Sequence, residues 1–327
     1  MEKKLQVAFI YKKNSHVLNG TWWSTTHHHF FMNALKRNSR IIVTYFPCGE
    51  KFDITKYKNM FDVVLLALND PMVTPKIEGI NQLKIPVICG SSDPQENIPR
   101  KEFHNQWKIN AYFSWLQKEF FYKYYPKNFR YKQLFFGLEP HLFSNVTPFN
   151  QRIKDRILNT GSMGNSKILS RIINSIRNPD NAFHHYKLRT ICNKLPFVDY
   201  TPTLQHEYVG DKFTLLLQKY RASIAAGTYA PVVKYFEIPA SGCLTFMEVT
   251  NKNYCDLLGY EDNKTVIFIN EQNYKEKFEE YLNDIDNPKW ETIAKNGREY
   301  AMKNFNNDKA VNDLVDLMDE LILKNEF

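Results

Sequence analysis

The sequence predicts an α/β protein made of two tandem units, each with a parallel β-sheet covered by helices. Three observations support this prediction. Short apolar segments alternate with segments of helical spacing, and the whole pattern restarts near the middle of the chain. The length of 327 residues also suits two domains, at roughly 100–200 residues per domain. We expect the first domain over residues 1–145 and the second over residues 146–327.

The composition is that of a globular protein. Hydrophobic residues make up 43% of the chain and charged residues 24%, which excludes a disordered chain. No apolar run approaches the roughly 18 residues of a membrane span, and the apolar segment near the start is too short for a signal peptide. The five cysteines form no CxxC pair or Cys/His cluster, so we expect reduced thiols and no metal site. These features predict a cytoplasmic protein.

A net charge of +8 favours an anionic partner. Nucleotides, nucleic acids and lipid head groups all fit this charge, and the last of these would mean peripheral association with a membrane. The basic residues are spread along the chain rather than gathered in a run, so a solvated surface is the alternative.

The first half contains four predicted strands, all mostly apolar. They cover residues 5–11, 41–46, 61–68 and 85–89, and helices are expected over 25–37 and 74–83. Continuous apolar strands separated by helices are typical of parallel sheets that are covered on both faces.

The second half repeats this pattern after a join near residues 140–148. Strands are expected over 156–159, 186–192, 222–226, 244–248 and 265–269. Helices are expected over 167–177, 212–220 with Asp211 as its cap, 232–241, 273–282, 288–305 and 308–323. Pro239 should disturb the end of the third of these helices. The final helix is expected to cross back to the first domain.

A glycine motif, Gly-Ser-Met-Gly at residues 161–164, follows a predicted strand and opens a predicted helix. Backbone N–H groups and the helix dipole can hold a phosphate at such a turn. Lys167 and Arg171 lie four residues apart and would add positive charge. Glycines at strand–helix turns also serve geometry alone, so both interpretations stay open.

A second candidate is the pair Lys234 and Glu237, three residues apart on the predicted helix before Gly242. One interpretation is an exposed ion pair, worth about 0.2–0.5 kcal/mol. In the other interpretation, the lysine binds a diphosphate and the carboxylate accepts hydrogen bonds from two vicinal hydroxyls. Spacing alone does not decide between them.

The segment Lys-x-x-Glu-x-x-Ala-x-Gly at residues 234–242 resembles the donor-binding element of the group 1 glycosyltransferases. These enzymes have the GT-B fold, in which two Rossmann-like domains face a central cleft. Residues 135–143, FFGLEPHLF, are similar to the family's P-F-G-V-D-P-x-x-F stretch between the domains. Residues 270–305 resemble its closing pattern, with an I-A-x-x-G element at 293–297. The resemblance is good over 134–310 and only architectural before that.

The resemblance implies a hexosyltransferase that moves a sugar from a nucleotide-sugar donor in the second domain to an acceptor in the first. Glu237 would hold the donor ribose hydroxyls and Lys234 the phosphates. The implied donor-binding residues are Gly161, Ser162, Gly164, Lys167, Arg221, Val233, Lys234 and Glu237. Many relatives have a second glutamate eight positions before the ribose-binding one, where this chain has Tyr229. The sugar-ring contacts and the choice between retention and inversion therefore stay open. The sequence also does not identify the sugar or the base of the donor.

In mechanism, Lys234, the 161–164 turn and Arg221 would stabilise the charge that develops on the leaving diphosphate, which makes a metal unnecessary. A solvated arginine is the alternative for Arg221. Asp284 and Asp286 imitate the Asp-x-Asp metal motif of another glycosyltransferase fold, but they follow an acidic helix, so we expect a solvated loop there.

A run of three histidines ends the segment over residues 20–29, after the first predicted strand. Ligands bind at the carboxyl ends of such strands, and a histidine of near-neutral pKa can act as a general base. We expect His29 or His27 to act there, with a surface patch as the alternative. Metal binding is disfavoured because these two side chains point to different helix faces.

The acceptor is not identified by the sequence. A glycan, a lipid-linked glycan, a protein and DNA all remain open. Two further classes also remain: a nucleic-acid binding or DNA-modifying protein, favoured by the net charge and the aromatic residues, and an inactive structural protein on the same scaffold.

Overall fold

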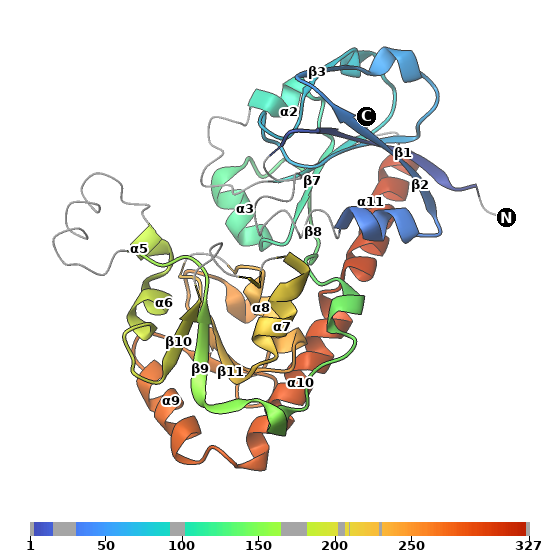
Figure 1. Cartoon of the computed structure of the whole chain (residues 1–327). Helices are drawn as coiled ribbons and strands as arrows, with labels where there is room; N and C mark the ends of the chain where they lie inside the picture. Colours follow the sequence, from blue (N-terminus) through green and yellow to red (C-terminus); the bar gives the residue numbers. More distant parts are fainter. Residues whose placement is uncertain are drawn as a thin grey trace. The chain divides into compact units, whose positions relative to one another are not determined.

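The computed structural model in Figure 1 describes residues 3–15, 31–91, 102–164, 182–201, 207–208, 210–228 and 231–324. The chain divides into two compact units. The first comprises Met1–Glu139 together with Asn306–Phe327, and the second comprises Pro140–Phe305. Each unit contains a parallel sheet with helices, so the predicted α/β class is confirmed.

The main sheet of the first unit has the strand order β2-β1-β4-β6-β7-β8, with parallel pairing throughout. Its strands are β1 (Leu5–Lys12), β2 (Ile41–Cys48), β4 (Val63–Leu66), β6 (Val87–Gly90), β7 (Ala111–Ser114) and β8 (Tyr131–Gln133). The middle of β1 and all of β4 are buried, which explains their continuous apolar sequences. The four strands predicted here are confirmed, while β7 and β8 had not been predicted.

The helix predicted over residues 74–83 is wrong. This segment forms β5 (Lys76–Glu78), which pairs with β3 (Lys51–Asp53), and then the 3-10 turn η2 (Ile80–Gln82). Gly79 separates the two with a φ of +78°, a conformation that ends regular structure and that glycine adopts at little cost. The other helical segments described before residue 125 are residues 31–37, η1 (Ile54–Tyr57), α2 (Phe103–Gln106) and α3 (Lys118–Tyr124).

Helix α11 (Asn307–Lys324) follows the second unit in the chain but belongs to the first (Figure 1). Its apolar side chains Val311 and Leu314 join the same core as Val7 and Phe9 of β1. Burial of this amphipathic face holds the helix on the sheet, because apolar area removed from water contributes roughly 25 cal/mol per Å².

The second unit has the strand order β10-β9-β11-β12-β13, again entirely parallel. The strands are β9 (Ile153–Thr160), β10 (Val198–Thr201), β11 (Tyr220–Ala225), β12 (Leu244–Glu248) and β13 (Ile267–Ile269). From β9 the chain moves outward to β10 and then returns to place β11 on the other side of β9. The space between the carboxyl ends of β9 and β11 is therefore a topological switch point, where ligands bind in sheets of this kind.

Helices and 3-10 turns connect these strands. They are η5 (Pro140–Phe143), η6 (Phe149–Gln151), α5 (Ala182–His185), α6 (Lys187–Cys192), η7 (Gly210–Lys212), α7 (Phe213–Leu217), α8 (Lys234–Ala240), η8 (Cys255–Leu258), α9 (Tyr274–Asn283) and α10 (Pro288–Asn304). The strand predicted over 186–192 is wrong, since α6 occupies it. Its buried positions are Leu188, Arg189, Thr190 and Cys192, so most of the circumference of this short helix is packed inside the unit.

Pro239 lies inside α8 rather than ending it early. A proline cannot donate to the carbonyl four residues earlier, which here belongs to Tyr235. The Tyr260 hydroxyl donates to that carbonyl at 2.9 Å, so the lost helix bond is replaced. This replacement keeps the buried helix regular up to Ala240.

Candidate functional site

The carboxyl edge of the second sheet gathers buried charged residues from three neighbouring elements. Because the strands are parallel, Thr160 at the end of β9 and Glu248 at the end of β12 lie at the same edge. Helix α8 starts at Lys234, and α6 carries Arg189. Buried charges are costly unless they are paired or bound to a ligand, so this edge is the candidate site.

Lys234 is only 4% exposed, and its Nζ donates to the Thr160 carbonyl at 2.6 Å. Gly161 follows that carbonyl with a φ of +96°, and a Cβ placed on it would lie 2.0 Å from Lys234 Nζ. The glycine is therefore required both by its backbone conformation and by the lysine. Burial lowers the pKa of Lys234 well below its ordinary value, and the positive charge of Arg189 adds to this effect while Glu237 opposes it.

Glu237 is 8% exposed, and its Oε2 is buried without a hydrogen-bond partner. Burial raises the pKa of this carboxyl to about 8, against the opposing effect of Lys234. The alternative of an exposed ion pair between these two residues is therefore wrong, because both side chains are buried. The free carboxyl oxygen can accept hydrogen bonds from a ligand.

The Arg189 side chain connects the two loops that follow β9 and β11, at the topological switch point. Its Nη1 donates to the carbonyl of Ser162, just after β9, at 3.1 Å, and its Nη2 donates to the carbonyl of Ala226, just after β11. The guanidinium also lies 4.5 Å from the ring centroid of Tyr186, a cation–π contact. The side chain is buried, and its Nε has no hydrogen-bond partner. Burial lowers the pKa of Arg189.

Glu248 completes the cluster at the end of β12. It is 1% exposed; its Oε1 accepts from the Thr228 hydroxyl at 3.5 Å, and its Oε2 is buried without a partner. Burial raises the pKa of Glu248 to about 7, and the positive charge of Arg189 opposes this rise. Hydrogen bonds from the Tyr235 hydroxyl and the Asn253 amide to the Glu248 carbonyl, both 2.9 Å, fix its backbone.

The other predicted site residues fall into three groups. Gly161 and Ser162 lie in the cluster, and Val233 immediately precedes α8. Gly164 has a packing role, since a Cβ there would lie 2.1 Å from the Phe183 Cα. The residues His27, His29, Lys167, Arg171 and Tyr229 lie outside the described residues.

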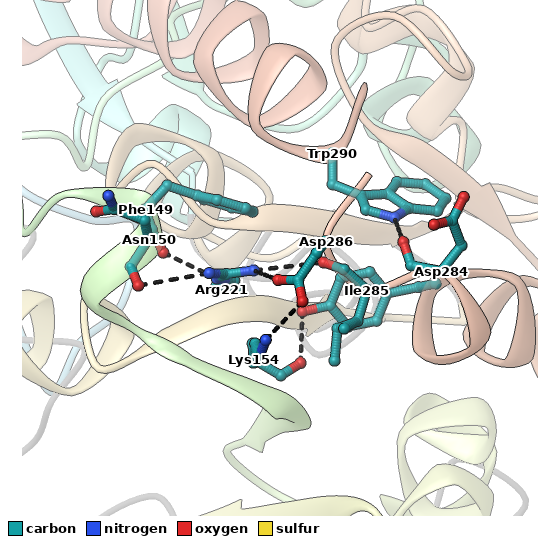
Figure 2. A network of polar contacts seen from close by, with 9 residues as sticks. Phe149, Asn150, Lys154, Arg221, Asp284, Ile285, Asp286 and Trp290 are labelled. Carbon is teal, nitrogen blue, oxygen red and sulfur yellow. Dashed lines mark hydrogen bonds and ion pairs between the residues drawn. The ribbon is translucent and has the colours of Figure 1, made fainter. Parts of the chain in front are cut away.

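Arg221 belongs to a different network of polar contacts (Figure 2). It is the second residue of β11, so it lies near the amino edge of the sheet, whereas Lys234 binds the last carbonyl of β9 at the carboxyl edge. Its Nε donates to the Phe149 carbonyl at 3.0 Å, and its Nη1 forms an ion pair with Asp286 at 3.1 Å. These partners hold the guanidinium at the amino edge, so the structure does not bring Arg221 together with Lys234 and Glu237.

The Asp-x-Asp sequence at residues 284–286 belongs to this structural network. Lys154 binds the Asp286 carboxylate at 2.6 Å, and the Asp284 carbonyl accepts from the Trp290 indole at 2.7 Å (Figure 2). Within the described part of the chain, no group of three or more His, Cys, Asp or Glu side chains could hold a metal ion. Nor does any helix there have the length and apolar character needed to cross a membrane.

The sequence did not identify Arg189 or Glu248. The first was hidden because its segment was predicted as a strand, which would not have directed it to this edge. The second had an available signal, since a glutamate that ends an otherwise apolar strand in a parallel sheet must lie at the ligand-binding edge.

No protein-family model matches the sequence, and no curated protein matches it either. Solved structures do match along almost the whole chain. A glycosyltransferase from Rickettsia africae is similar with a TM-score of 0.58 at 12% identity, over 99% of this chain and 100% of that one.

Two further similar structures contain ligands. HepE from Anabaena, solved with UDP-glucose, has a TM-score of 0.59 at 10% identity, over 97% of this chain and 100% of that one. An α-glucosyltransferase solved with UDP and DNA has a TM-score of 0.58 at 9% identity, over the same shares. At these identities the similarity establishes the fold, and the chain has the GT-B fold expected from its sequence.

Proposed function

We propose that the chain is a nucleotide-sugar-dependent glycosyltransferase of the hexosyltransferase type. The observation that carries this proposal is the buried pair Lys234 and Glu237 at the carboxyl edge, with Gly161 leaving room at the lysine ammonium. A buried cation and a buried carboxyl with a free oxygen suit a ligand that carries both phosphates and hydroxyls. A nucleotide sugar has both.

In this mechanism the protein binds the donor through two contacts. Lys234 binds the diphosphate and stabilises the negative charge that develops as the glycosidic bond to the phosphate breaks. Glu237 accepts hydrogen bonds from the ribose hydroxyls through the oxygen that has no partner in the unliganded protein. Because the lysine supplies the positive charge, we propose that this step needs no metal ion. His27 or His29 would remove the proton from the acceptor hydroxyl.

The neighbouring structures support a UDP-sugar as the donor, since HepE was solved with UDP-glucose. A second candidate function is a DNA-modifying glycosyltransferase. The net charge of +8 favours it, and one neighbour was solved with UDP and DNA. Glycans, lipid-linked glycans at a membrane surface and proteins are the other candidate acceptors. We place the protein in the cytoplasm, where nucleotide sugars would be available to it.

The direct test is a thermal-shift screen with UDP, ADP, GDP, CDP and TDP and the corresponding nucleotide sugars. A ligand present at about 100 times its dissociation constant stabilises a protein by about 2.7 kcal/mol, which raises the melting temperature measurably. The expected result is stabilisation by one diphosphate and its sugar derivative. If none of them raises the melting temperature even at millimolar concentration, the proposal is wrong.

The acceptor class is tested separately, with the donor that this screen identifies. Transfer of a radiolabelled sugar is measured with duplex DNA, glycans, lipid extracts and proteins as acceptors. A DNA acceptor also predicts that DNA affinity falls steeply as salt rises, because phosphate contacts release counterions. Transfer to a glycan with no measurable DNA affinity would exclude the DNA candidate.

A further inference from the structure

The first unit buries polar side chains of a different kind from those of the second. Among the described residues, the buried lysine and arginines all belong to the second unit: Arg152, Arg189, Arg221 and Lys234. The polar side chains buried in the first unit are neutral apart from the carboxylates of Asp70 and Glu139, and the second of these is paired with Arg37. The interior of the first unit therefore suits a neutral ligand better than a phosphate.

Some of these neutral groups follow neighbouring strands of the first sheet. The parallel strands β4, β6 and β7 are followed by Asn69, Ser91 and Gln117. The amide of Asn69 donates to the Gly90 carbonyl at 2.9 Å. The amide of Ser91 donates to the Phe113 carbonyl at 2.8 Å. These bonds extend the strand pairing past the strand ends, so the polar residues lie together at the carboxyl edge, where ligands bind in open α/β sheets.

Gln117 is the residue at this edge whose hydrogen bonding is incomplete. It precedes α3 as the N-cap residue, but its side chain makes no capping hydrogen bond. The residue is 1% exposed, and neither its Oε1 nor its Nε2 has a hydrogen-bond partner. A buried amide in this condition costs stability, so its presence requires an explanation.

Aromatic side chains account for the other buried, unpartnered polar atoms among the described residues of this unit. These atoms belong to His104, Trp107 and Tyr112. Trp107 and Tyr112 lie in the apolar core, and the His104 ring stacks 3.8 Å from that of Phe129. Burial of a ring contributes enough apolar area to offset one unmade hydrogen bond. Gln117 has no ring and leaves both ends of its amide unpaired, so we attribute its position to a ligand.

We infer that Gln117 binds two adjacent hydroxyl groups of the acceptor, and that the acceptor is a neutral carbohydrate. One hydroxyl donates to Oε1 and the other accepts from Nε2, an arrangement that vicinal hydroxyls on a sugar ring supply. DNA and anionic lipids are disfavoured because the buried Asp70 lies at the same edge and no buried cation of the described part of this unit offsets its charge. This inference rests on the proposed function, because it takes the first unit to hold the acceptor.

The acceptor class is tested by measuring transfer from the donor that the screen above identifies. The neutral acceptors are p-nitrophenyl glycosides of glucose, galactose, mannose and N-acetylglucosamine. The anionic acceptors are p-nitrophenyl glucuronide, duplex DNA and vesicles of phosphatidylglycerol. At least one neutral glycoside should receive the sugar with a higher kcat/KM than any of the anionic acceptors.

The role of Gln117 is tested with Gln117→Met, which keeps the length of the side chain and removes both hydrogen-bonding groups. It should lower kcat/KM for the neutral acceptor about 5- to 150-fold, the value of two neutral hydrogen bonds. Donor affinity and donor hydrolysis without acceptor should stay within about twofold, and the melting temperature should not fall. The matched control is Gln218→Met, because Gln218 is also buried but its Oε1 accepts from the Thr147 amide at 2.9 Å. This control should lower the melting temperature and leave acceptor kcat/KM unchanged.

The outcomes separate this inference from the proposed function. Unchanged acceptor kcat/KM in folded Gln117→Met, or an equal loss in donor hydrolysis, overturns the role of Gln117. Donor binding with no transfer to any neutral glycoside, or with better transfer to an anionic acceptor, overturns the acceptor class. Each of these results leaves the proposed function standing, whereas a natural chain that binds no donor overturns both.

Monodeoxy analogues of the accepted glycoside provide a second test on the natural chain, which is decisive if Gln117→Met does not fold. Loss of either of two adjacent hydroxyls, other than the one that receives the sugar, should lower kcat/KM because the buried amide is then left unpaired. If no adjacent pair of hydroxyls has this effect, the inference is wrong.

Discussion

The two edges of the second sheet contain charged side chains of the same kinds, mostly exposed at the amino edge and buried at the carboxyl edge, but only one edge completes their interactions. At the amino edge, Arg221 and Lys154 share the carboxylate of Asp286, and backbone carbonyls take the remaining donors (Figure 2). At the carboxyl edge, Glu237 and Glu248 each keep a buried oxygen without a partner. A completed network stabilises the fold, whereas an incomplete one costs stability until a ligand completes it.

This comparison predicts opposite responses to mutation at the two edges. Substitutions at the carboxyl edge should change ligand binding or turnover and leave the unliganded protein as stable as before or more so. Substitutions at the amino edge should lower stability and leave ligand binding unchanged. The predictions below test this contrast, beginning with the largest expected effect.

Lys234→Gln should lower the turnover of the nucleotide-sugar donor by about 10²- to 10³-fold, the usual cost of removing one group that stabilises developing negative charge. The melting temperature without ligand should not fall, because a buried charge is removed. Steady-state kinetics and thermal unfolding measure the two quantities. Turnover within tenfold of the natural chain would show that another group stabilises the leaving diphosphate.

Glu237→Gln should weaken donor binding by about 10- to 150-fold. Above pH 8, where Glu237 with its raised pKa of about 8 is ionised, the amide keeps the shape of the carboxylate but loses the charge that strengthens hydrogen bonds from two hydroxyls, each worth roughly 1.5–3 kcal/mol. Calorimetry with the donor measures this loss, and a 2′-deoxyribose analogue provides a control. The analogue should bind the natural chain more weakly but should lose less on substitution, since one hydroxyl is already absent. Unchanged donor affinity in the folded variant would contradict the role of Glu237.

Glu248 should make the stability of the protein depend on pH. Its pKa is raised to about 7 in the folded chain from an ordinary value of 4.5, so the folded state holds a proton that the unfolded state has lost between these values. Stability therefore falls as pH rises from about 4.5 to 7, by at most about 3 kcal/mol for a shift of this size. Denaturant unfolding at pH 5 and pH 8 should show a smaller decrease for Glu248→Gln. The same decrease in both proteins would mean that Glu248 does not titrate in this range.

Arg221→Gln should lower the free energy of unfolding by about 1–3 kcal/mol, because the part-buried carbonyls of Phe149 and Ile285 lose a charged donor. For a unit of this size that corresponds to a fall of roughly 2–10 °C in the melting temperature. Donor affinity should stay within about twofold, since the residue lies at the far edge. A loss of donor affinity without a loss of stability would restore Arg221 to the ligand site.

Lys154→Gln is the smallest change of the series. Its ion pair with Asp286 is solvent-exposed on both sides, and such pairs contribute little because water screens them. The melting temperature should change by no more than about 2 °C. A larger fall would mean that Lys154 supports Arg221 through their shared carboxylate, and the double variant with Arg221→Gln would then be less than additive.

The sequence predicted the strands of the two sheets better than their connections. Continuous apolar segments such as 222–226 and 244–248 became β11 and β12 because burial on both faces leaves a clear pattern. The segment 186–192 was assigned to the wrong class because its β-branched and aromatic residues suggested a strand, while tertiary packing overrode this local preference and the segment forms a helix. The true strand β10 has only one fully buried residue, Val198, so its pattern was too weak to detect.

In the candidate site, too, the residues with a clear local sequence pattern were predicted and those without one were missed. Lys234 and Glu237 were found because they are close in sequence and fit a familiar spacing. Arg189 and Glu248 join them only through the order of the strands, which no local pattern contains. The proposed roles of His27, His29 and Lys167 remain predictions, since these residues lie outside the described part of the chain.

The return of α11 to the first unit has a consequence for how the protein is made. Val311 and Leu314 fill the core beside β1, so this core stays open while the ribosome is still translating the second unit. The second unit, which is continuous in sequence, can fold first, although domains usually complete in order from the amino terminus. A stalled chain that stops before Asn307 would expose the apolar face of the first sheet, and nascent chains of this protein should therefore depend on chaperones until α11 has emerged.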